Sequence, residues 1–202
     1  MPNQHDVSPN NPCPFLRALV ANGYVGGHVV PRSKISEIIP LAGGKTGLAE
    51  IFAKLETFGV TLLANGTRTT LAGLALDELR NGPLDKHGAG SRILGVDAQV
   101  HEDEIERLAG FGQECNNPAG GTERGLTAKQ IDTYMAANMK RAGDAARFYY
   151  PKLMEKEWPI LLEFMGKGEG EARYLSVADV RTLFIDRQFP KCITDRLPVP
   201  GM

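Results

Sequence analysis

Apolar residues recur every three or four positions along much of the chain, a spacing typical of amphipathic helices. The clearest example is residues 14–22, where Phe15, Leu16 and Leu19 share one face and Gly23 follows as a helix-ending residue. The same spacing predicts helices over residues 32–39, 48–58, 71–80, 102–111, 127–150 and 177–184, and one that begins at Pro151 and carries Trp158. The pattern therefore predicts a mainly α chain.

Segments without this spacing separate the predicted helices. Residues 60–70 fit either a small hairpin around Asn65-Gly66 or a turn between helices. Residues 84–95 and 113–125 are rich in glycine and polar residues, so we predict loops there. Residues 1–12 are polar and rich in Pro and Asn, which predicts a flexible arm. No repeat or change of composition divides the rest, so residues 13–202 are expected to form a single domain.

Composition and charge narrow the class of protein. The chain has 202 residues, of which 42% are hydrophobic and 23% charged, as in a globular domain that can enclose a cofactor. Its net charge of -1 and lack of a basic cluster argue against nucleic-acid binding. No apolar run approaches the roughly 20 residues of a membrane helix. No signal peptide is visible, so we expect a cytoplasmic protein, and a homodimer is left open.

Cysteine usage points to one position. Cys13, Cys115 and Cys192 are odd in number and widely spaced, which does not fit a disulfide framework or a zinc site. If the chain were exported, Cys192 could form an intermolecular disulfide. Cys13 alone has informative neighbours, because Pro12 and Pro14 flank it directly before the predicted helix.

The position of Cys13 predicts an activated thiol. Pro14 is suited to the first helical position, which makes Cys13 the N-cap. The helix N–H groups and the positive end of the helix dipole would then stabilise the thiolate. Such a thiolate can be a nucleophile, a redox centre or a soft metal ligand, and a plain capping cysteine fits the local chemistry as well.

The segment from Pro12 onward resembles the N-terminal signature of the haem-thiolate peroxidases, the family of chloroperoxidase and the unspecific peroxygenases. The positions in common are Pro12, Cys13, Pro14, Leu16, Leu19, Asn22, Gly23 and Tyr24. Residues 174–190 are similar to the final helix of that family. The resemblance implies a chloroperoxidase-like helical fold around haem b, with Cys13 as axial iron ligand and Pro12, Pro14 and Leu16 beside the cofactor. It implies a peroxidase or peroxygenase that oxidises or oxygenates small organic substrates with hydrogen peroxide.

The family also has an acid–histidine–serine motif after its early helices, which binds a divalent cation such as Mg²⁺. The corresponding stretch, residues 84–92, offers Asp85 and Ser91 as cation ligands and His87, with Asp85, as the catalytic pair. The motif departs from the family because Lys86 separates the acid from the histidine and Gly88 replaces a final Asp.

A catalytic carboxylate beside an arginine is expected on a later helix, but Ala142 follows Arg141 where the family has Glu. Asp132 and Asp144 lie on that predicted helix and Glu155 on the next, and none matches by motif. The acids after His101, residues 102–104, are interpreted as an exposed helix N-terminus. Arg181 and Arg187 are expected to form surface ion pairs.

Three other functions stay open. A non-catalytic haem protein, a sensor or carrier, would keep the thiolate and dispense with the distal acid. A thiol-dependent redox enzyme would use Cys13 without haem. A calcium-binding EF-hand-like loop from Asp85 would place Gly90 at the turn, but its twelfth position is Val96 in place of Glu.

Overall fold

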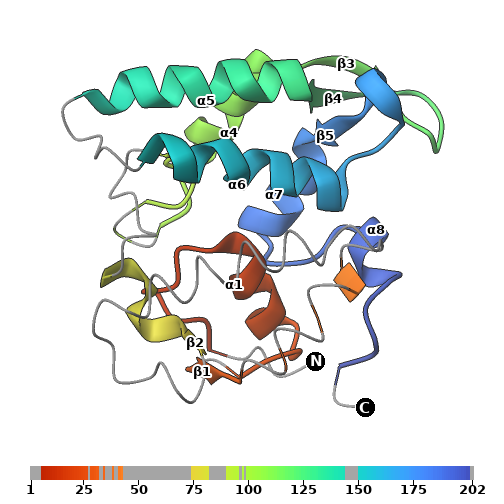
Figure 1. Ribbon diagram of the computed structural model, residues 1–202. Coiled ribbons are helices and arrows are strands. Elements are labelled where there is room, and N and C mark those ends of the chain that lie inside the picture. The colour runs from red at the N-terminus through yellow and green to blue at the C-terminus, as the bar shows by residue number, and fades with distance from the viewer. Residues whose placement is uncertain are drawn as a thin grey trace. The chain divides into compact units, whose positions relative to one another are not determined.

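The computed structural model describes residues 6–26, 28–31, 34, 38, 41–42, 74–81, 90–95, 97, 99–143 and 150–200 (Figure 1). Two compact units make up the chain. Unit 1 comprises residues 1–85 and 187–202, and unit 2 comprises residues 86–186. Unit 2 is therefore inserted between two parts of unit 1. The predicted helices at residues 32–39 and 48–58, and the ambiguous residues 60–70, lie wholly or largely outside the described residues.

Helix α1 (Pro14–Ala21) of unit 1 forms where the apolar spacing predicts it. Pro14 occupies the first helical position, and Cys13 is the N-cap with extended backbone angles, φ -87° and ψ 114°. Three residues of this helix, Ala18, Leu19 and Val20, are fully buried. The helix ends at the C-cap Asn22, and the next residue, Gly23, has a φ of 75°, the left-handed conformation that glycine adopts without strain.

The second part of unit 1 differs from the prediction. The sequence predicts a helix over residues 71–80, but strand β2 (Leu74–Ala75) pairs antiparallel with β1 (Val29–Val30), and a 3-10 helix, η1 (Leu76–Asn81), follows. Residues 71–73 lie outside the described residues. The Leu76 N–H donates to the His28 carbonyl at 2.8 Å, so residues 74–76 pair with the segment of β1 where the sequence predicts helix. A short helix, α8 (Lys191–Thr194), completes the described part of this unit.

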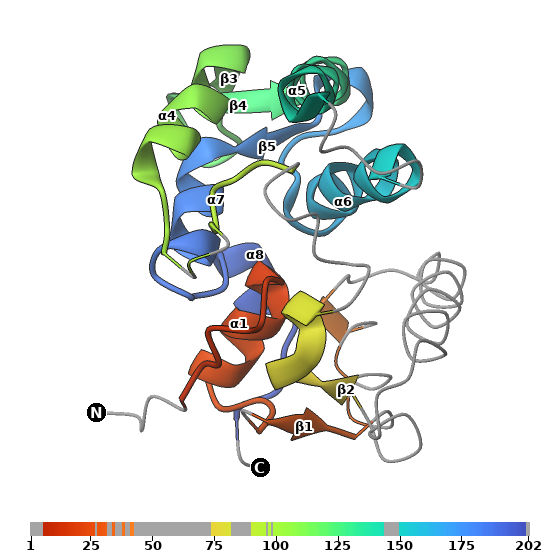
Figure 2. The ribbon, with the colours of Figure 1, turned by 90° about the vertical axis from the view of Figure 1, so that its left-hand side faces the viewer.

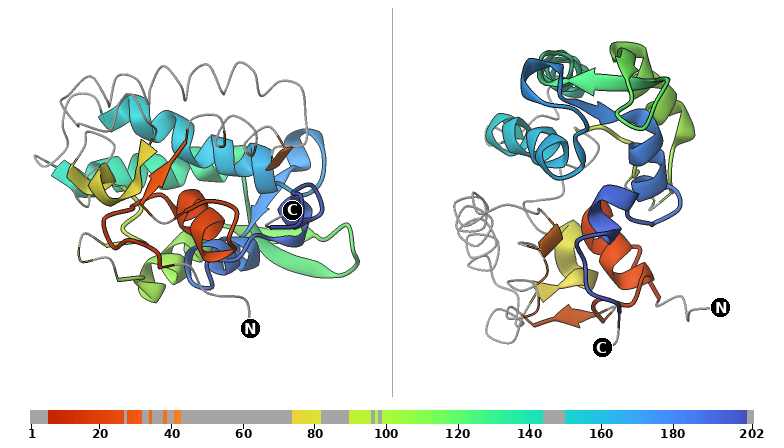
Figure 3. Two further views of the ribbon diagram at one scale, coloured as in Figure 1. Left: turned by 90° about the horizontal axis from the view of Figure 1, so that it is seen from below. Right: turned by 90° about the vertical axis from the view of Figure 1, so that its right-hand side faces the viewer.

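Unit 2 combines four helices of the described chain with a three-stranded sheet. The helices are α4 (Glu102–Phe111), α5 (Ala128–Ala142), α6 (Tyr150–Met165) and α7 (Val177–Phe184), and a 3-10 turn, η3 (Gly170–Ala172), precedes the last strand. The sheet order is β3–β4–β5, entirely antiparallel. Figure 2 shows α4 and α7 on one side of the strands and α5 and α6 on the other, and Figure 3 shows α5 and α6 side by side. Trp158, Tyr134 and Phe184 form an aromatic core between these elements.

The segment 113–125, predicted as a loop, is mostly a hairpin. Strand β3 (Gln113–Asn116) pairs with β4 (Thr122–Thr127), and β4 pairs with β5 (Tyr174–Ser176). Gly121 allows the turn, because its φ of 74° suits only glycine well. The prediction was wrong because most outward positions of this hairpin are polar, and no run of apolar side chains marks it as a strand.

The mainly α fold class is also wrong. The described residues are mixed α/β, with two small antiparallel sheets among the helices. An antiparallel strand can have one face against helices and the other in solvent, so a short strand carries few apolar residues. The helical spacing therefore identified the longer elements and left the strands unrecognised.

Candidate functional site

Cys13 lies at the start of α1 in a backbone that local contacts fix. Its N–H donates to Asn11 Oδ1 at 3.1 Å, and its carbonyl accepts the Arg17 N–H at 3.0 Å. Asn11 is fully buried, whereas Pro12, Cys13, Pro14 and Leu16 are half-buried. A rigid, partly accessible thiol at a helix N-terminus, with apolar neighbours, is an arrangement suited to a soft metal ion.

A buried arginine lies one helical turn beyond this cysteine. Arg17 is only 3% exposed, and its pKa is lowered to about 10. Burial is the largest cause, the positive charges of Arg187 and Arg80 contribute, and the negative charge of Cys13 partly opposes them. Arg17 therefore lies close enough to Cys13 for the two side chains to interact electrostatically.

The residues before α1, predicted as an arm, make specific contacts with these arginines. Arg17 Nη1 donates to the carbonyls of Ser8 and Asn11 at 3.4 and 3.3 Å. Arg80 Nε donates to the Pro9 carbonyl at 2.8 Å, and the Arg80 N–H donates to the Asn10 carbonyl at 3.0 Å. Residues 8–11 therefore form a turn that two guanidinium groups hold next to Cys13.

The two segments that carry the family resemblance meet within unit 1. The Phe15 ring of α1 lies 5.0 Å from the Phe189 ring, measured between centroids, and the Tyr24 ring lies 6.1 Å from it. The side-chain amide of Asn22 donates to the Arg187 carbonyl at 2.8 Å. Residues 187–189 are thus packed along the helix that begins at Cys13.

Of the predicted distal residues Asp85, His87 and Ser91, the structure describes Ser91 alone. Asp85 and His87 lie outside the described residues, as does half of the EF-hand-like loop, residues 85–89 and 96. Ser91 is described and half-buried, and its Oγ accepts the Ile93 N–H at 3.4 Å. Among the residues that the structure describes, no group of three His, Cys, Asp or Glu side chains could hold a metal ion.

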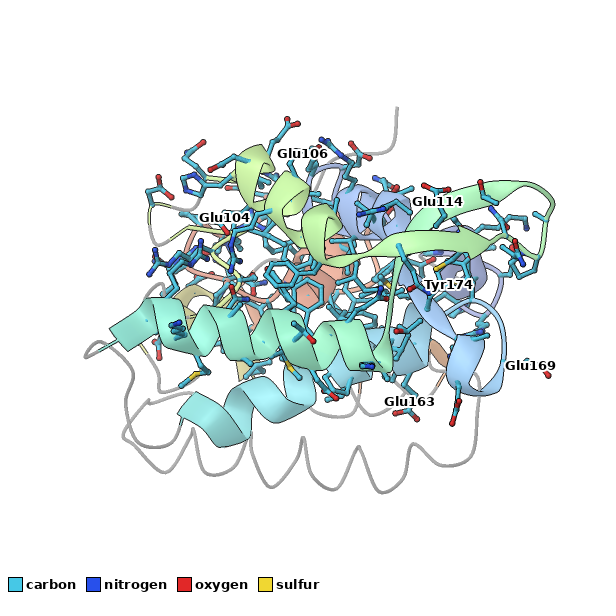
Figure 4. All side chains as sticks on the ribbon, turned by 90° about the horizontal axis from the view of Figure 1, so that it is seen from above. Glu104, Glu106, Glu114, Glu163, Glu169 and Tyr174 are labelled. Atoms are coloured by element: carbon cyan, nitrogen blue, oxygen red, sulfur yellow. The ribbon has the colours of Figure 1, made fainter. Side chains whose placement is uncertain are left out.

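A carboxylate–arginine pair does occur in unit 2, but its acid is one that the sequence did not single out. Glu104 of α4 forms a bidentate ion pair with Arg141 of α5, with bonds of 2.5 and 3.0 Å. The side chain of Glu104 is only 13% exposed, so its interpretation as part of an exposed helix N-terminus was wrong. Figure 4 shows Glu104 on the side of α4 that faces α5, with Glu106 on the outer side. Asp132, in contrast, is exposed on α5.

The predicted distal segment reaches this ion pair at one point. Arg141 Nη2 also donates to the Ser91 carbonyl at 3.3 Å. Arg107, one turn along α4 from Glu104, donates to Asn138 Oδ1 at 2.6 Å and covers the Tyr134 ring at 5.4 Å. Burial raises the pKa of Tyr134 to about 12. No local signal in the sequence joins Glu104 to Arg141, because they are far apart along the chain and meet only through helix packing.

A second polar cluster, here called the Glu123 cluster, links the sheet of unit 2 to its helices. Glu123 on β4 accepts hydrogen bonds from the Tyr174 and Ser176 hydroxyls at 2.8 and 2.7 Å and from Lys167 Nζ at 2.9 Å. Lys167 also pairs with Asp179 at 3.1 Å. Tyr174 and Ser176 are buried on β5, and Figure 4 shows Tyr174 beneath the hairpin, opposite Glu114. No local pattern in the sequence marks this cluster, because Glu123 lies far along the chain from its partners.

Arg181 behaves as predicted. It forms exposed ion pairs with Glu102 at 3.1 Å and Glu106 at 2.8 Å. Arg187 is exposed, and no acidic side chain of the described residues pairs with it. Within the described residues, no helix is long and apolar enough to cross a membrane.

Comparisons with known proteins found no relative of this chain. No family model matches the chain, and no curated protein or solved structure shows a significant match. The functional assignment therefore depends on the residues of the chain and their geometry.

Proposed function

We propose that this chain is a haem-thiolate peroxidase or peroxygenase in which Cys13 is the axial ligand of haem b. The observation that carries the proposal is the position of Cys13 at the N-cap of α1, with Pro14 at the first helical position and half-buried apolar neighbours. The function is one of oxidising or oxygenating small organic substrates with hydrogen peroxide.

The donor set at Cys13 fits haem. A thiolate is the ligand that distinguishes this class of haem protein, and Arg17 supplies a buried positive charge that interacts electrostatically with Cys13. Pro12, Pro14 and Leu16 offer apolar surface to a flat, largely apolar macrocycle. These residues would hold the cofactor, and a divalent cation bound with the help of Asp85 and Ser91 is part of the same proposal.

Haem with a thiolate ligand supplies the capacity to cleave the O–O bond of peroxide. Residues of unit 1 around Cys13 would hold the axial ligand in position. The hydrogen bond from the Cys13 N–H to Asn11 and the bond from the Arg17 N–H to the Cys13 carbonyl fix the backbone, so the direction of the sulfur is defined before the cofactor binds.

His87 is our candidate for the residue that moves protons, as the family resemblance implies. A neutral imidazole can take a proton from one oxygen of peroxide and return it to the other.

The deciding experiment is the absorbance spectrum of the haem-supplemented protein, reduced under carbon monoxide, for the wild type and for Cys13→Ser. We expect a strongly red-shifted Soret band in the wild type, because thiolate is the ligand, and its loss in Cys13→Ser. Cys192→Ser, a second half-buried cysteine of unit 1, is the matched control and should retain the band. A haem-free wild type would overturn the proposal in favour of a thiol-dependent enzyme, and an unchanged spectrum in Cys13→Ser would remove Cys13 as ligand.

Turnover of a phenolic chromogen with hydrogen peroxide tests His87. His87→Ala should lower kcat by about 10²–10⁴-fold, the usual effect of losing a general acid–base residue, while the carbon monoxide spectrum stays unchanged. His28→Ala, at an exposed histidine of unit 1, is the control. If His87→Ala turns over as fast as the control, then proton transfer falls to another group. Turnover absent from a wild type with a thiolate spectrum would favour a haem sensor or carrier.

A further inference from the structure

Two arginines donate to all four carbonyls of the turn before Cys13, residues 8–11. Arg17 Nη1 donates to the first and the last of these carbonyls, at 3.4 and 3.3 Å. Arg80 donates to the two in between, from Nε at 2.8 Å and from its backbone N–H at 3.0 Å. The backbone acceptors of the turn are thus all bonded, which holds the turn in one conformation.

Arg80 brings this support from a distant part of the sequence. It lies in η1 and is only 8% exposed. The bond from the Leu76 N–H to the His28 carbonyl ties the start of η1 to the rest of unit 1. Figure 2 shows η1, in yellow, beside α1. Arg80 therefore connects the turn 8–11 to a segment that is itself anchored.

The turn acts on Cys13 through the side chain of Asn11. Asn11 is fully buried, and its Oδ1 accepts the Cys13 N–H at 3.1 Å. Among the described residues, Asn11 Nδ2 has no hydrogen-bond partner, which is unfavourable for a buried amide. The contact that accounts for an amide at this position is therefore the bond between Oδ1 and Cys13.

The prolines leave few backbone torsions open around Cys13. Pro12 and Pro14 have a fixed φ, and the residues before them, Asn11 and Cys13, are restricted in ψ. The peptide that joins Pro12 to Cys13 can still rotate. The bond from the Cys13 N–H to Asn11 Oδ1 holds that peptide, so it sets the direction of the Cα–Cβ bond that carries the sulfur.

We propose that Arg80 is a positioning residue for Cys13, acting through the turn 8–11 and Asn11 Oδ1. The inference rests on the proposed function, because it concerns the axial ligand of haem. Arg80 holds the middle of the turn, the turn holds Asn11 in its buried place, and Asn11 holds the peptide before Cys13. The family resemblance begins at Pro12 and includes neither Arg80 nor Asn11.

Alkylation of the full-length protein by iodoacetamide before haem is added, with each cysteine followed by mass spectrometry, tests this positioning. At about pH 9.5, above the ordinary thiol pKa of about 8.5, the rate reports the accessibility of a sulfur and not its ionisation. Arg80→Met and Asn11→Ala should each raise the rate at the half-buried Cys13 by about fivefold, the effect of losing one hydrogen bond. The rate at Cys192, which is half-buried in the same unit, should stay unchanged.

Two variants serve as controls. Asn11→Asp keeps Oδ1 and lacks only the unpartnered Nδ2, so its Cys13 should react at the wild-type rate. Arg196→Met should also leave the rate unchanged, because Arg196 is an exposed arginine of unit 1 whose bonded carbonyl, that of Ala42, lies outside the turn. With haem added, Arg80→Met and Asn11→Ala should lose part of the red-shifted carbon monoxide band at equal haem content, and both controls should retain it.

Asn11→Ala decides the matter if Arg80→Met fails to fold, because it leaves both arginines in place. Equal rates at Cys13 in the wild type and Asn11→Ala would overturn the proposal. So would a rise at Cys192 as large as that at Cys13, since a general loosening of unit 1 exposes both thiols. A wild type that binds no haem would remove the peroxidase assignment, whereas the alkylation rates would still decide whether Arg80 and Asn11 hold Cys13 in place.

Discussion

Glu123 and Asp179 pair with the same lysine, yet their surroundings shift their pKa values in opposite directions. Burial raises the pKa of Asp179, and its contact with Lys167 only partly opposes this. Burial acts on Glu123 too, but bonds from Ser176, Lys167 and Tyr174 outweigh it and lower the pKa of Glu123. Burial also raises the pKa of the Cys115 thiol, and the negative charge of Glu123 raises this pKa further. The sign of each shift thus follows from the number of donors to the charged form.

Replacing Glu123 by Gln should lower the free energy of unfolding near pH 7 by about 2–4 kcal/mol, because it leaves Lys167 without its bidentate partner and turns one acceptor into a donor. Urea denaturation measures the change. Glu114→Gln, on the exposed side of β3, is the control and should change stability by less than about 0.5 kcal/mol.

The effect of Glu123→Gln should also depend on pH. A carboxylate with a lowered pKa stabilises the fold above its ordinary pKa, 4.5 for Glu, and this contribution disappears as the pH falls through the lower folded value. The difference between the wild type and Glu123→Gln should therefore stay nearly constant from about pH 7 to about pH 5 and narrow as the pH falls below 4.5 and through the lower folded value. A difference that does not narrow between about pH 5 and about pH 2 would show that the charge of Glu123 does not stabilise the fold.

Single residues could be predicted from the sequence where their role is local. Cys13 is an N-cap because its two proline neighbours restrict the backbone, and Arg181 forms surface ion pairs, both as predicted. Glu104 could not be assigned, because its environment depends on Arg141 of another helix. The same holds for Glu123, whose partners come from two later segments, Lys167 and strand β5.

At the scale of elements, two glycines should respond to alanine in opposite ways. Gly110 lies exposed on α4, and the space that an alanine Cβ would occupy there is open, so Gly110→Ala should stabilise by about 0.5–1 kcal/mol through helix propensity. A Cβ on Gly125 of β4 would overlap the buried Tyr174 ring. Gly125→Ala should therefore destabilise by about 1–3 kcal/mol.

Thermal or urea denaturation of both alanine variants checks this contrast, and each variant is the control of the other. A stabilised Gly125→Ala variant would mean that β4 and β5 separate at little cost. Equal destabilisation by both changes would mean that the C-terminal turn of α4 requires glycine for a reason other than packing.

Elements with strong periodicity were predicted well. α1, α4 and α7 have the expected positions, and α5 begins after the predicted cap Thr127, where the Thr127 N–H donates to Gln130 Oε1 at 2.8 Å. α5 ends at Ala142, well before the predicted residue 150. The strands were missed because β1, β2 and β5 have only two or three residues each, too few to show an alternating pattern.

For the whole molecule, the sequence pattern contained no sign of two compact units or of mixed α/β architecture. Composition is uniform along the chain, and the division arises from contacts between distant segments, such as Phe15 with Phe189 in unit 1 and Tyr174 with Glu123 in unit 2. Local periodicity cannot report such contacts. The candidate chemistry at Cys13, which depends on adjacent residues, was accessible from the sequence, whereas the two arginines that hold the turn before it were not.

The insertion of unit 2 within unit 1 has a consequence for synthesis on the ribosome. The segment 86–186 is continuous, so all parts of unit 2 emerge one after another and can fold as they appear. Unit 1 has to wait for residues 187–202, on the order of ten seconds later at roughly 5–20 residues per second. Until Phe189 arrives, the Phe15 and Tyr24 rings cannot form their contacts with its ring, so nascent chains stalled before residue 187 should be the ones that most need a chaperone.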